Sequence, residues 1–176
     1  MNLNKINIAG QEAGIVLTAF PGRTAQNDFS IKEMQRVLDY LEAQNCYFFI
    51  SLVQDHEFNQ FCSKLVFRKE LAKRPLKWLR FPILDMSIPD KNILVKLDSF
   101  RPNFVDSFQS GSSIAVHCKG GLGRSGIIAA MILFDLGFTS QDAINHVRSF
   151  REGAIETKAQ ENFIKSLHKV VSHKTG

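Results

Sequence analysis

Residues 116–126 read Val-His-Cys-Lys-Gly-Gly-Leu-Gly-Arg-Ser-Gly, and this stretch decides how the rest of the chain is interpreted. Five residues separate Cys118 from Arg124, and three of the five are glycines. Glycine reaches positive φ without steric cost, so such a loop can turn successive backbone N–H groups toward one point and hold an anion there. The stretch therefore predicts a phosphate-binding loop with a thiol inside it.

The thiol needs this setting because a cysteine attacks phosphorus only as a thiolate, and a free thiol is only about a few per cent ionised at neutral pH. We expect the loop donors to stabilise the Cys118 thiolate and then hold the phosphoryl oxygens of a substrate. The predicted phosphate-binding residues are Lys119, Gly120, Gly121, Leu122, Gly123 and Arg124. We expect His117 to hydrogen-bond the loop backbone and support the cysteine; a satisfied core histidine is the alternative.

Two similar kinds of site fit these residues less well. A nucleotide-binding loop has glycine at the position of Cys118 and lysine at the position of Arg124. A zinc site needs more ligands than the adjacent pair of His117 and Cys118. A glycine-rich turn before a core helix remains as the purely structural alternative.

The composition predicts one globular domain over residues 1–176, with 44% hydrophobic and 22% charged residues. No run of 18 apolar residues and no secretory signal are evident, and three cysteines form no paired framework, so we expect a cytoplasmic protein. The formal net charge of +5 comes from scattered lysines and arginines. We interpret it as a solvated basic surface; attraction of anionic substrates is the alternative, and no nucleic-acid motif accompanies the charge.

Hydrophobic periodicity predicts alternating strands and helices. The predicted strands are 15–18, 46–53, 76–83 and 114–116; the predicted helices are 31–44, 56–65, 93–111 with a break at Pro102, 124–136, 140–150 and 157–172. Ser140 is the expected cap of the helix at 140–150. This order implies an α/β fold with a mostly parallel sheet between helices, and ligands bind at the carboxyl ends of such strands.

The departing oxygen of a phosphate ester needs a proton donor, and Asp85 is the preferred candidate. It follows a predicted strand, lies on a loop and precedes Cys118 by some thirty residues. Asp90 is the alternative, but it follows Pro89 and opens a helix, where capping is the expected role.

The pattern His-Cys-x-x-Gly-x-Gly-Arg-Ser resembles the signature of the cysteine-dependent phosphatases, the protein tyrosine and dual-specificity superfamily. Three further segments resemble the kinase-associated and Cdc14-like group: Phe20-Pro21-Gly22, the run from Pro82 through Asp85 to Asp90, and Gly153-Ala-Ile-Glu-Thr-x-x-Gln160. The likeness covers about residues 18–170 and implies the compact α/β phosphatase fold. It also implies that Gln160 orients the hydrolytic water. One departure is that Met86-Ser87 stand where the group usually has two glycines.

The mechanism that follows has two steps. Cys118 attacks phosphorus while Asp85 protonates the leaving oxygen; Asp85 then deprotonates a water, and Ser125 donates a hydrogen bond to the departing sulfur. No metal or other cofactor enters it. We expect a monomer acting on phosphorylated proteins. Two alternatives stay open: a polyanionic non-protein substrate, such as a phosphoinositide or an RNA 5′ end, suggested by Lys119, and a catalytically silent phospho-binding module.

Overall fold

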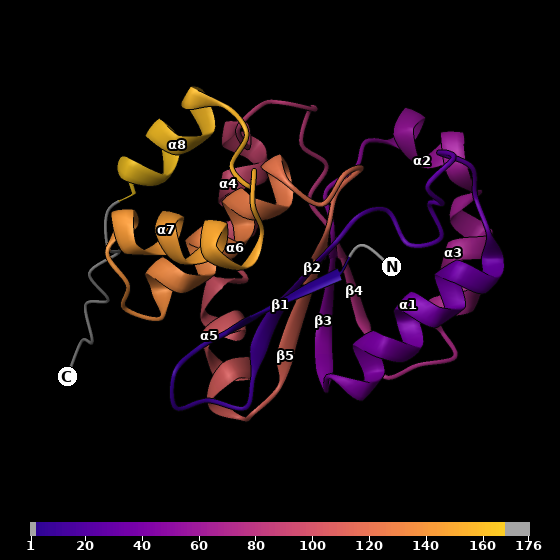
Figure 1. Cartoon of the computed structure of the whole chain (residues 1–176), viewed down its shortest axis with the longest axis horizontal. Helices are drawn as coiled ribbons and strands as arrows, with labels where there is room; N and C mark the ends of the chain where they lie inside the picture. Colours follow the sequence, from indigo (N-terminus) through magenta and orange to yellow (C-terminus); the bar gives the residue numbers. More distant parts are fainter. Residues whose placement is uncertain (1–2, 168–176) are drawn as a thin grey trace.

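The computed structural model describes residues 3–167 and is built around a five-stranded sheet (Figure 1). The strands are β1 (Leu3–Asn7), β2 (Gly14–Thr18), β3 (Cys46–Ser51), β4 (Lys77–Arg80) and β5 (Ser113–His117). Their order across the sheet is β1-β2-β5-β3-β4. All neighbours run parallel except β1, which pairs antiparallel with β2 at the edge. The predicted mostly parallel sheet is confirmed, and β1 is an element that the sequence pattern did not reveal.

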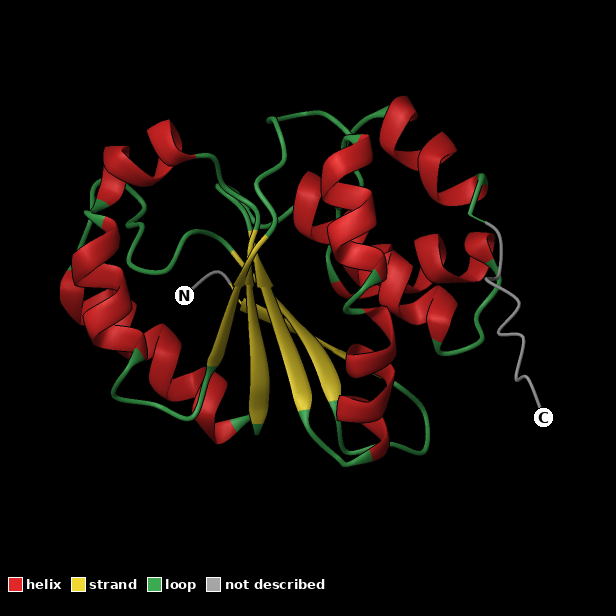
Figure 2. Cartoon of the chain, turned by 180° about the vertical axis from the view of Figure 1, so that it is seen from behind, coloured by secondary structure: helices red, strands yellow, loops and turns green. Residues whose placement is uncertain are grey.

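Helices cover both faces of the sheet (Figure 2). One layer holds α1 (Ile31–Ala43), α2 (Asp55–Phe61) and α3 (Lys64–Leu71). The other holds α4 (Lys91–Asp98), α5 (Arg101–Gln109), α6 (Gly123–Asp135), α7 (Ser140–Phe150) and α8 (Lys158–Lys165). No helix within residues 3–167 is long and apolar enough to cross a membrane.

The central strand β5 places the phosphate loop. Its five residues are all buried, because β2 and β3 flank it and helices cover both faces. Ile114 and Val116 pack into the core beneath α6, whereas Ala115 faces the core on the α1 side. His117 ends the strand level with Thr18 of β2 and Ser51 of β3, so Cys118 emerges at the carboxyl edge of the sheet.

Several predicted boundaries are corrected. The single helix expected at 56–65 is two helices, because Ser63 accepts from the Val66 N–H and starts α3. Thr139, and not Ser140, caps α7 through the Asp142 N–H. The strand expected at 76–83 is only Lys77–Arg80.

Other predictions hold. The break near Pro102 is confirmed, since α4 ends at Asp98 and α5 carries the proline in its first turn. The helix expected over 157–172 is present as α8, but it ends earlier than expected, at Lys165 with Ser166 as its C-cap; positions 168–172 lie outside the described part of the chain.

Candidate active site

Cys118 lies in the loop between β5 and α6, almost completely buried. Its Sγ accepts a hydrogen bond from the Gly121 N–H at 3.1 Å, and Ser125 Oγ lies 3.6 Å away. Ser125 stands in the first turn of α6, whose N-terminal N–H groups carry partial positive charge. The loop therefore brings one backbone N–H and one hydroxyl to the sulfur, and its phosphate binding stays a prediction.

The three loop glycines have different structural reasons. Only Gly121 has a positive φ, of 73°, and a Cβ there would lie 2.6 Å from the backbone of Thr18 and Ala19. A Cβ on Gly120 would meet nothing within 4 Å. A Cβ on Gly123 would lie 2.3 Å from the Glu156 carboxylate. The expectation that all three glycines provide positive φ is thus wrong for Gly120 and Gly123.

Arg124 is buried beside the loop and is held by a carboxylate that sequence reasoning missed. Its Nη1 and Nη2 donate to the two Glu57 oxygens at 2.6 and 2.8 Å, and Nη1 also donates to the Ile83 carbonyl at 3.0 Å. Burial alone would raise the pKa of Glu57, but the hydrogen bonds from Arg124 and the Gln54 N–H bring it below its usual value. Within the described residues, the buried Nε of Arg124 has no hydrogen-bond partner.

Asp85 lies beside Arg124, and its role as the proton donor stays a prediction. Its Oδ1 is 2.9 Å from Arg124 Nη2, and its side chain is half exposed. Met86, the residue that departs from the glycine pattern, has a φ of 59°, a conformation that glycine adopts more readily. Asp90 accepts from the Ile93 N–H at 2.9 Å and caps α4, which confirms the capping role expected for it.

Gln160 is fully buried at the start of α8. Its Nε2 donates to the Ser87 carbonyl in the acid loop at 3.2 Å, and its Oε1 accepts from the Thr157 N–H at 3.3 Å. It therefore ties the acid loop to α8, and its water-orienting role stays a prediction. Glu156, from the same segment, hydrogen-bonds the phosphate loop: its Oε2 accepts from the Gly123 N–H at 2.7 Å.

His117 is fully buried, and burial lowers its pKa to about 3. Trp78 Nε1 donates to Ser51 Oγ at 2.7 Å, and Ser51 Oγ lies 2.5 Å from His117 Nε2. With Trp78 as donor, the Ser51 hydroxyl is free to donate to Nε2, which leaves the proton on Nδ1 facing the Cys118 carbonyl at 3.3 Å. His117 is thus neutral and lies against the loop backbone, and its role as a support for Cys118 stays a prediction.

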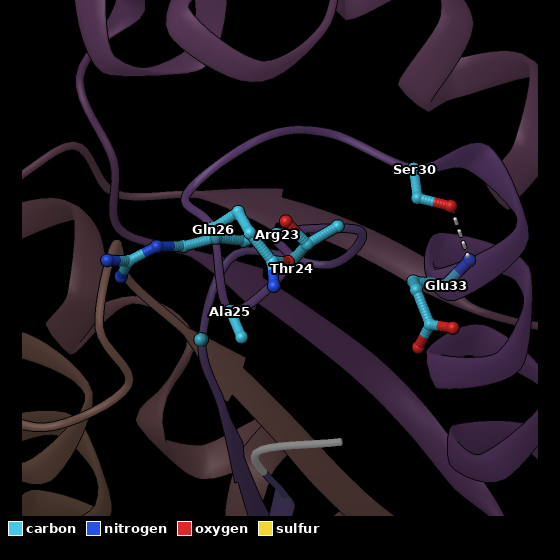
Figure 3. A pocket seen from close by; sticks show the side chains of 7 residues that line it. Arg23, Thr24, Ala25, Gln26, Ser30 and Glu33 are labelled. Atoms are coloured by element: carbon cyan, nitrogen blue, oxygen red, sulfur yellow. Dashed lines mark hydrogen bonds between the residues drawn. The ribbon is translucent and has the colours of Figure 1, made fainter.

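An open cavity of about 800 Å³ adjoins the loop (Figure 3), on the β2–α1 connection. It is lined by Ala19, Arg23, Thr24, Ala25, Gln26, Ser30 and Glu33. Arg23 joins it to the site, because its Nη1 donates to the Lys119 carbonyl at 3.0 Å.

Comparison with known proteins agrees with this geometry. Residues 63–164 match the model of the PTP-SAK family, described as the DSP-PTPase phosphatase domain of Swiss Army Knife proteins. The chain belongs to this family. The match contains Cys118, Arg124 and Asp85, whereas Glu57 lies outside the segment matched to the PTP-SAK domain.

Curated relatives are named as phosphatases, and each alignment covers only part of the relative. The chain is 30% identical over 122 residues to the tyrosine-protein phosphatase CDC14 of Candida albicans, covering 69% of this chain and 20% of that protein. It is 39% identical over 70 residues to the protein tyrosine phosphatase type IVA 3 of Bos taurus, covering 40% of this chain and 39% of that protein. The PTP-SAK chain thus matches well under half the length of these relatives.

A solved structure shows the same fold. The kinase associated phosphatase, with its catalytic-site cysteine replaced by serine, superposes with a TM-score of 0.76 at 19% identity, covering 93% of this chain and 92% of that one. The predicted closeness to the kinase-associated and Cdc14-like group is confirmed.

Proposed function

We propose that this chain is a cysteine-dependent phosphatase that hydrolyses phosphomonoesters on phosphotyrosine, phosphothreonine or phosphoserine of proteins. One observation carries the proposal: the Cys118 sulfur lies inside a loop whose Gly121 N–H points at it, next to the buried Arg124 with its unpartnered Nε. A buried donor without an acceptor is costly in a folded protein. A phosphoryl oxygen would satisfy it.

In the first step the Cys118 thiolate attacks phosphorus, so that an S–P bond forms as the ester P–O bond breaks. Backbone N–H groups of residues 119–124 and the Arg124 guanidinium hold the equatorial oxygens. Asp85 gives its proton to the leaving oxygen. For this it must first take up a proton and leave Arg124 Nη2, 2.9 Å away, which frees that N–H for the substrate.

In the second step water attacks the phosphocysteine. The Asp85 carboxylate takes the proton of the water, the S–P bond breaks, and inorganic phosphate leaves. Ser125 Oγ, 3.6 Å from the sulfur, is placed to donate to the thiolate as it departs. Gln160 anchors Ser87, next to Met86 and Asp85, so it supports the acid loop in both steps.

A protein substrate is favoured over a polyanionic headgroup by the rim of the site. This rim is the acid loop, where Leu84, Met86 and Ile88 stand close to Asp85 in the sequence and expose 59%, 52% and 40% of their surface. Exposed apolar side chains on this loop can pack against a peptide side chain or a tyrosine ring, whereas a highly charged headgroup offers them no apolar surface. We further propose that the chain acts as one phosphatase domain; a monomeric state and a cytoplasmic location stay predictions.

The test is phosphate release from phosphotyrosine peptides, phosphothreonine peptides and phosphoinositides, with EDTA present and Cys118→Ser protein as the blank. We expect release from the peptides that is absent in the blank. Release from phosphoinositides alone, falling steeply with salt, would select the polyanion alternative that Lys119 suggests. Stoichiometric peptide binding without release would select a phospho-binding module.

A further inference from the structure

Three successive carbonyl groups of the phosphate loop accept hydrogen bonds from two arginines outside the loop. Arg23 Nη1 donates to the Lys119 carbonyl at 3.0 Å. Arg151 Nη2 donates to the Gly120 carbonyl at 3.1 Å, and Arg151 Nε donates to the Gly121 carbonyl at 3.1 Å. A guanidinium is a rigid planar fork, so two of its donors can fix two neighbouring carbonyls at once.

Holding these carbonyls determines where the loop N–H groups point. The described chain has no cis peptide bond, and in a trans peptide the C=O and the following N–H point in opposite directions. The Gly120 carbonyl and the Gly121 N–H belong to one peptide plane. Arg151 holds the carbonyl oxygen at one edge of that plane. The N–H at the opposite edge donates to Cys118 Sγ at 3.1 Å.

Each arginine is oriented in turn by an asparagine. Asn4 Oδ1, on the edge strand β1, accepts from Arg151 Nη1 at 2.5 Å. Asn27 Oδ1 accepts from Arg23 Nε at 2.8 Å. Arg151 itself is buried at the end of α7, so its side chain links β1 to the loop.

We propose that Arg151 and Arg23 are positioning residues that keep the N–H groups of the phosphate loop directed at the nucleophile, with Asn4 coupling the edge strand to the loop through Arg151. The inference rests on the proposed use of Cys118 as nucleophile. Burial lowers the pKa of Arg151, and negative charge on Cys118 acts in the opposite direction.

The decisive variant is Arg151→Lys, which keeps the positive charge but lacks the planar fork of donors that holds two neighbouring carbonyls. The matched control is Arg74→Lys. Arg74 is also largely buried and donates to a backbone carbonyl, that of Glu70 at 3.0 Å, but it lies on the α1–α3 face. Three quantities are measured for each: the inhibition constant of inorganic phosphate, the rate of Cys118 alkylation by iodoacetamide at acidic and neutral pH, and the unfolding temperature.

Alkylation is read from the mass of the peptide that carries Cys118. This separates it from Cys46 and Cys62, whose pKa values burial raises to about 12 and about 11. We expect Arg151→Lys to weaken phosphate binding about tenfold or more and to slow alkylation most at acidic pH. Arg74→Lys should change neither phosphate binding nor the alkylation rate, even where it lowers the unfolding temperature as much as Arg151→Lys does.

Equal phosphate affinity and equal alkylation in Arg151→Lys and in wild type would overturn the proposal. If Arg151→Lys does not fold, Asn4→Ala tests the same link, since it removes only the acceptor that orients Arg151. The expected result is a smaller loss in both readouts, and no loss in either would again overturn the proposal. Alkylation requires no turnover, so slower alkylation in a protein that hydrolyses nothing would support the positioning role while refuting the proposed function.

Discussion

Glu57 and Arg124 form a buried ion pair between residues 67 positions apart in the chain. Such a pair is costly to break, because removing one charge leaves the other buried without compensation. The pair also fixes the guanidinium plane next to Cys118. Both the stability of the site and its chemistry therefore depend on a residue outside the loop.

We predict that Glu57→Gln lowers the free energy of unfolding by about 3 kcal/mol and lowers kcat/KM by about tenfold or more. Urea unfolding and steady-state kinetics measure the two effects. Glu161→Gln is the control, since Glu161 pairs with Arg148, Lys158 and Lys165, whose side chains are all partly exposed, and its loss should destabilise the protein much less. Equal losses in both variants would contradict the special role of the buried pair.

Glu156 places a carboxylate on an N–H of the phosphate loop, where it competes with the phosphoryl group for the Gly123 donor. We predict that Glu156→Gln tightens the binding of inorganic phosphate roughly several-fold, because it removes the negative charge and keeps the shape. Competitive inhibition measures this. Glu152→Gln, an exposed change in the same segment, should have no effect; weaker phosphate binding in Glu156→Gln would refute the prediction.

The sequence predicts Cys118, Arg124 and Ser125 because all three lie within one short loop, and their spacing there is typical of a thiolate beside a bound phosphate. Glu57 is not predicted in this way. It forms a capping box with Gln54 at the start of α2, so its local position already explains a glutamate there. Its contact with Arg124 forms only when the fold brings α2 next to the phosphate loop. Arg151 is not predicted either, because its contacts with the phosphate loop form only in the folded chain. The signal in the sequence is an arginine next to an apolar segment, and such a residue is worth testing as a buried donor.

At the scale of elements, the phosphate loop offers a matched pair of glycine substitutions. Gly121→Ala must adopt a positive φ and also meet the backbone of Thr18 and Ala19, so we predict a loss of about 2 kcal/mol or more. Gly120→Ala has open space and should change the free energy of unfolding by less than about 1 kcal/mol. Chemical denaturation of both variants checks this, and equal destabilisation would contradict the predicted difference between the crowded Gly121 and the open Gly120.

Element order and type follow from hydrophobic periodicity, but ends and edges do not. The break between α2 and α3 depends on the Ser63 cap inside a continuous apolar pattern. The strand β1 has only five residues, mostly half buried, and forms because β2 offers a free edge. Its importance, through Asn4, lies in a contact that no local pattern contains.

For the whole molecule, the buried His117 predicts how stability depends on pH. Its folded pKa of about 3 lies below the value of about 6.5 expected in the unfolded chain, so the unfolded state binds the proton between these values. Stability is complete above about pH 6.5 and falls as the pH drops, by about 1.4 kcal/mol per pH unit. The nearby charges are Arg124, Arg80 and Glu57.

Urea unfolding between about pH 5 and about pH 6.5 tests this, because acidic groups with lowered pKa values lose their contribution only at lower pH. We expect His117→Gln to remove most of the slope, since an amide does not titrate. A slope that is the same in His117→Gln and in wild type would assign the pH dependence to other groups.

The two helical layers and the central β5 together place Cys118 in the loop at the carboxyl edge of the sheet, and the proposed mechanism requires that it becomes phosphorylated during turnover. This is measured most directly by rapid acid quenching of the enzyme with a phosphotyrosine peptide, followed by mass analysis of the Cys118 peptide. We predict a phosphoryl group on Cys118 that forms before free phosphate accumulates, and none in Cys118→Ser. Phosphate release with no phosphocysteine at any time, or equal release by Cys118→Ser, would contradict the proposed mechanism.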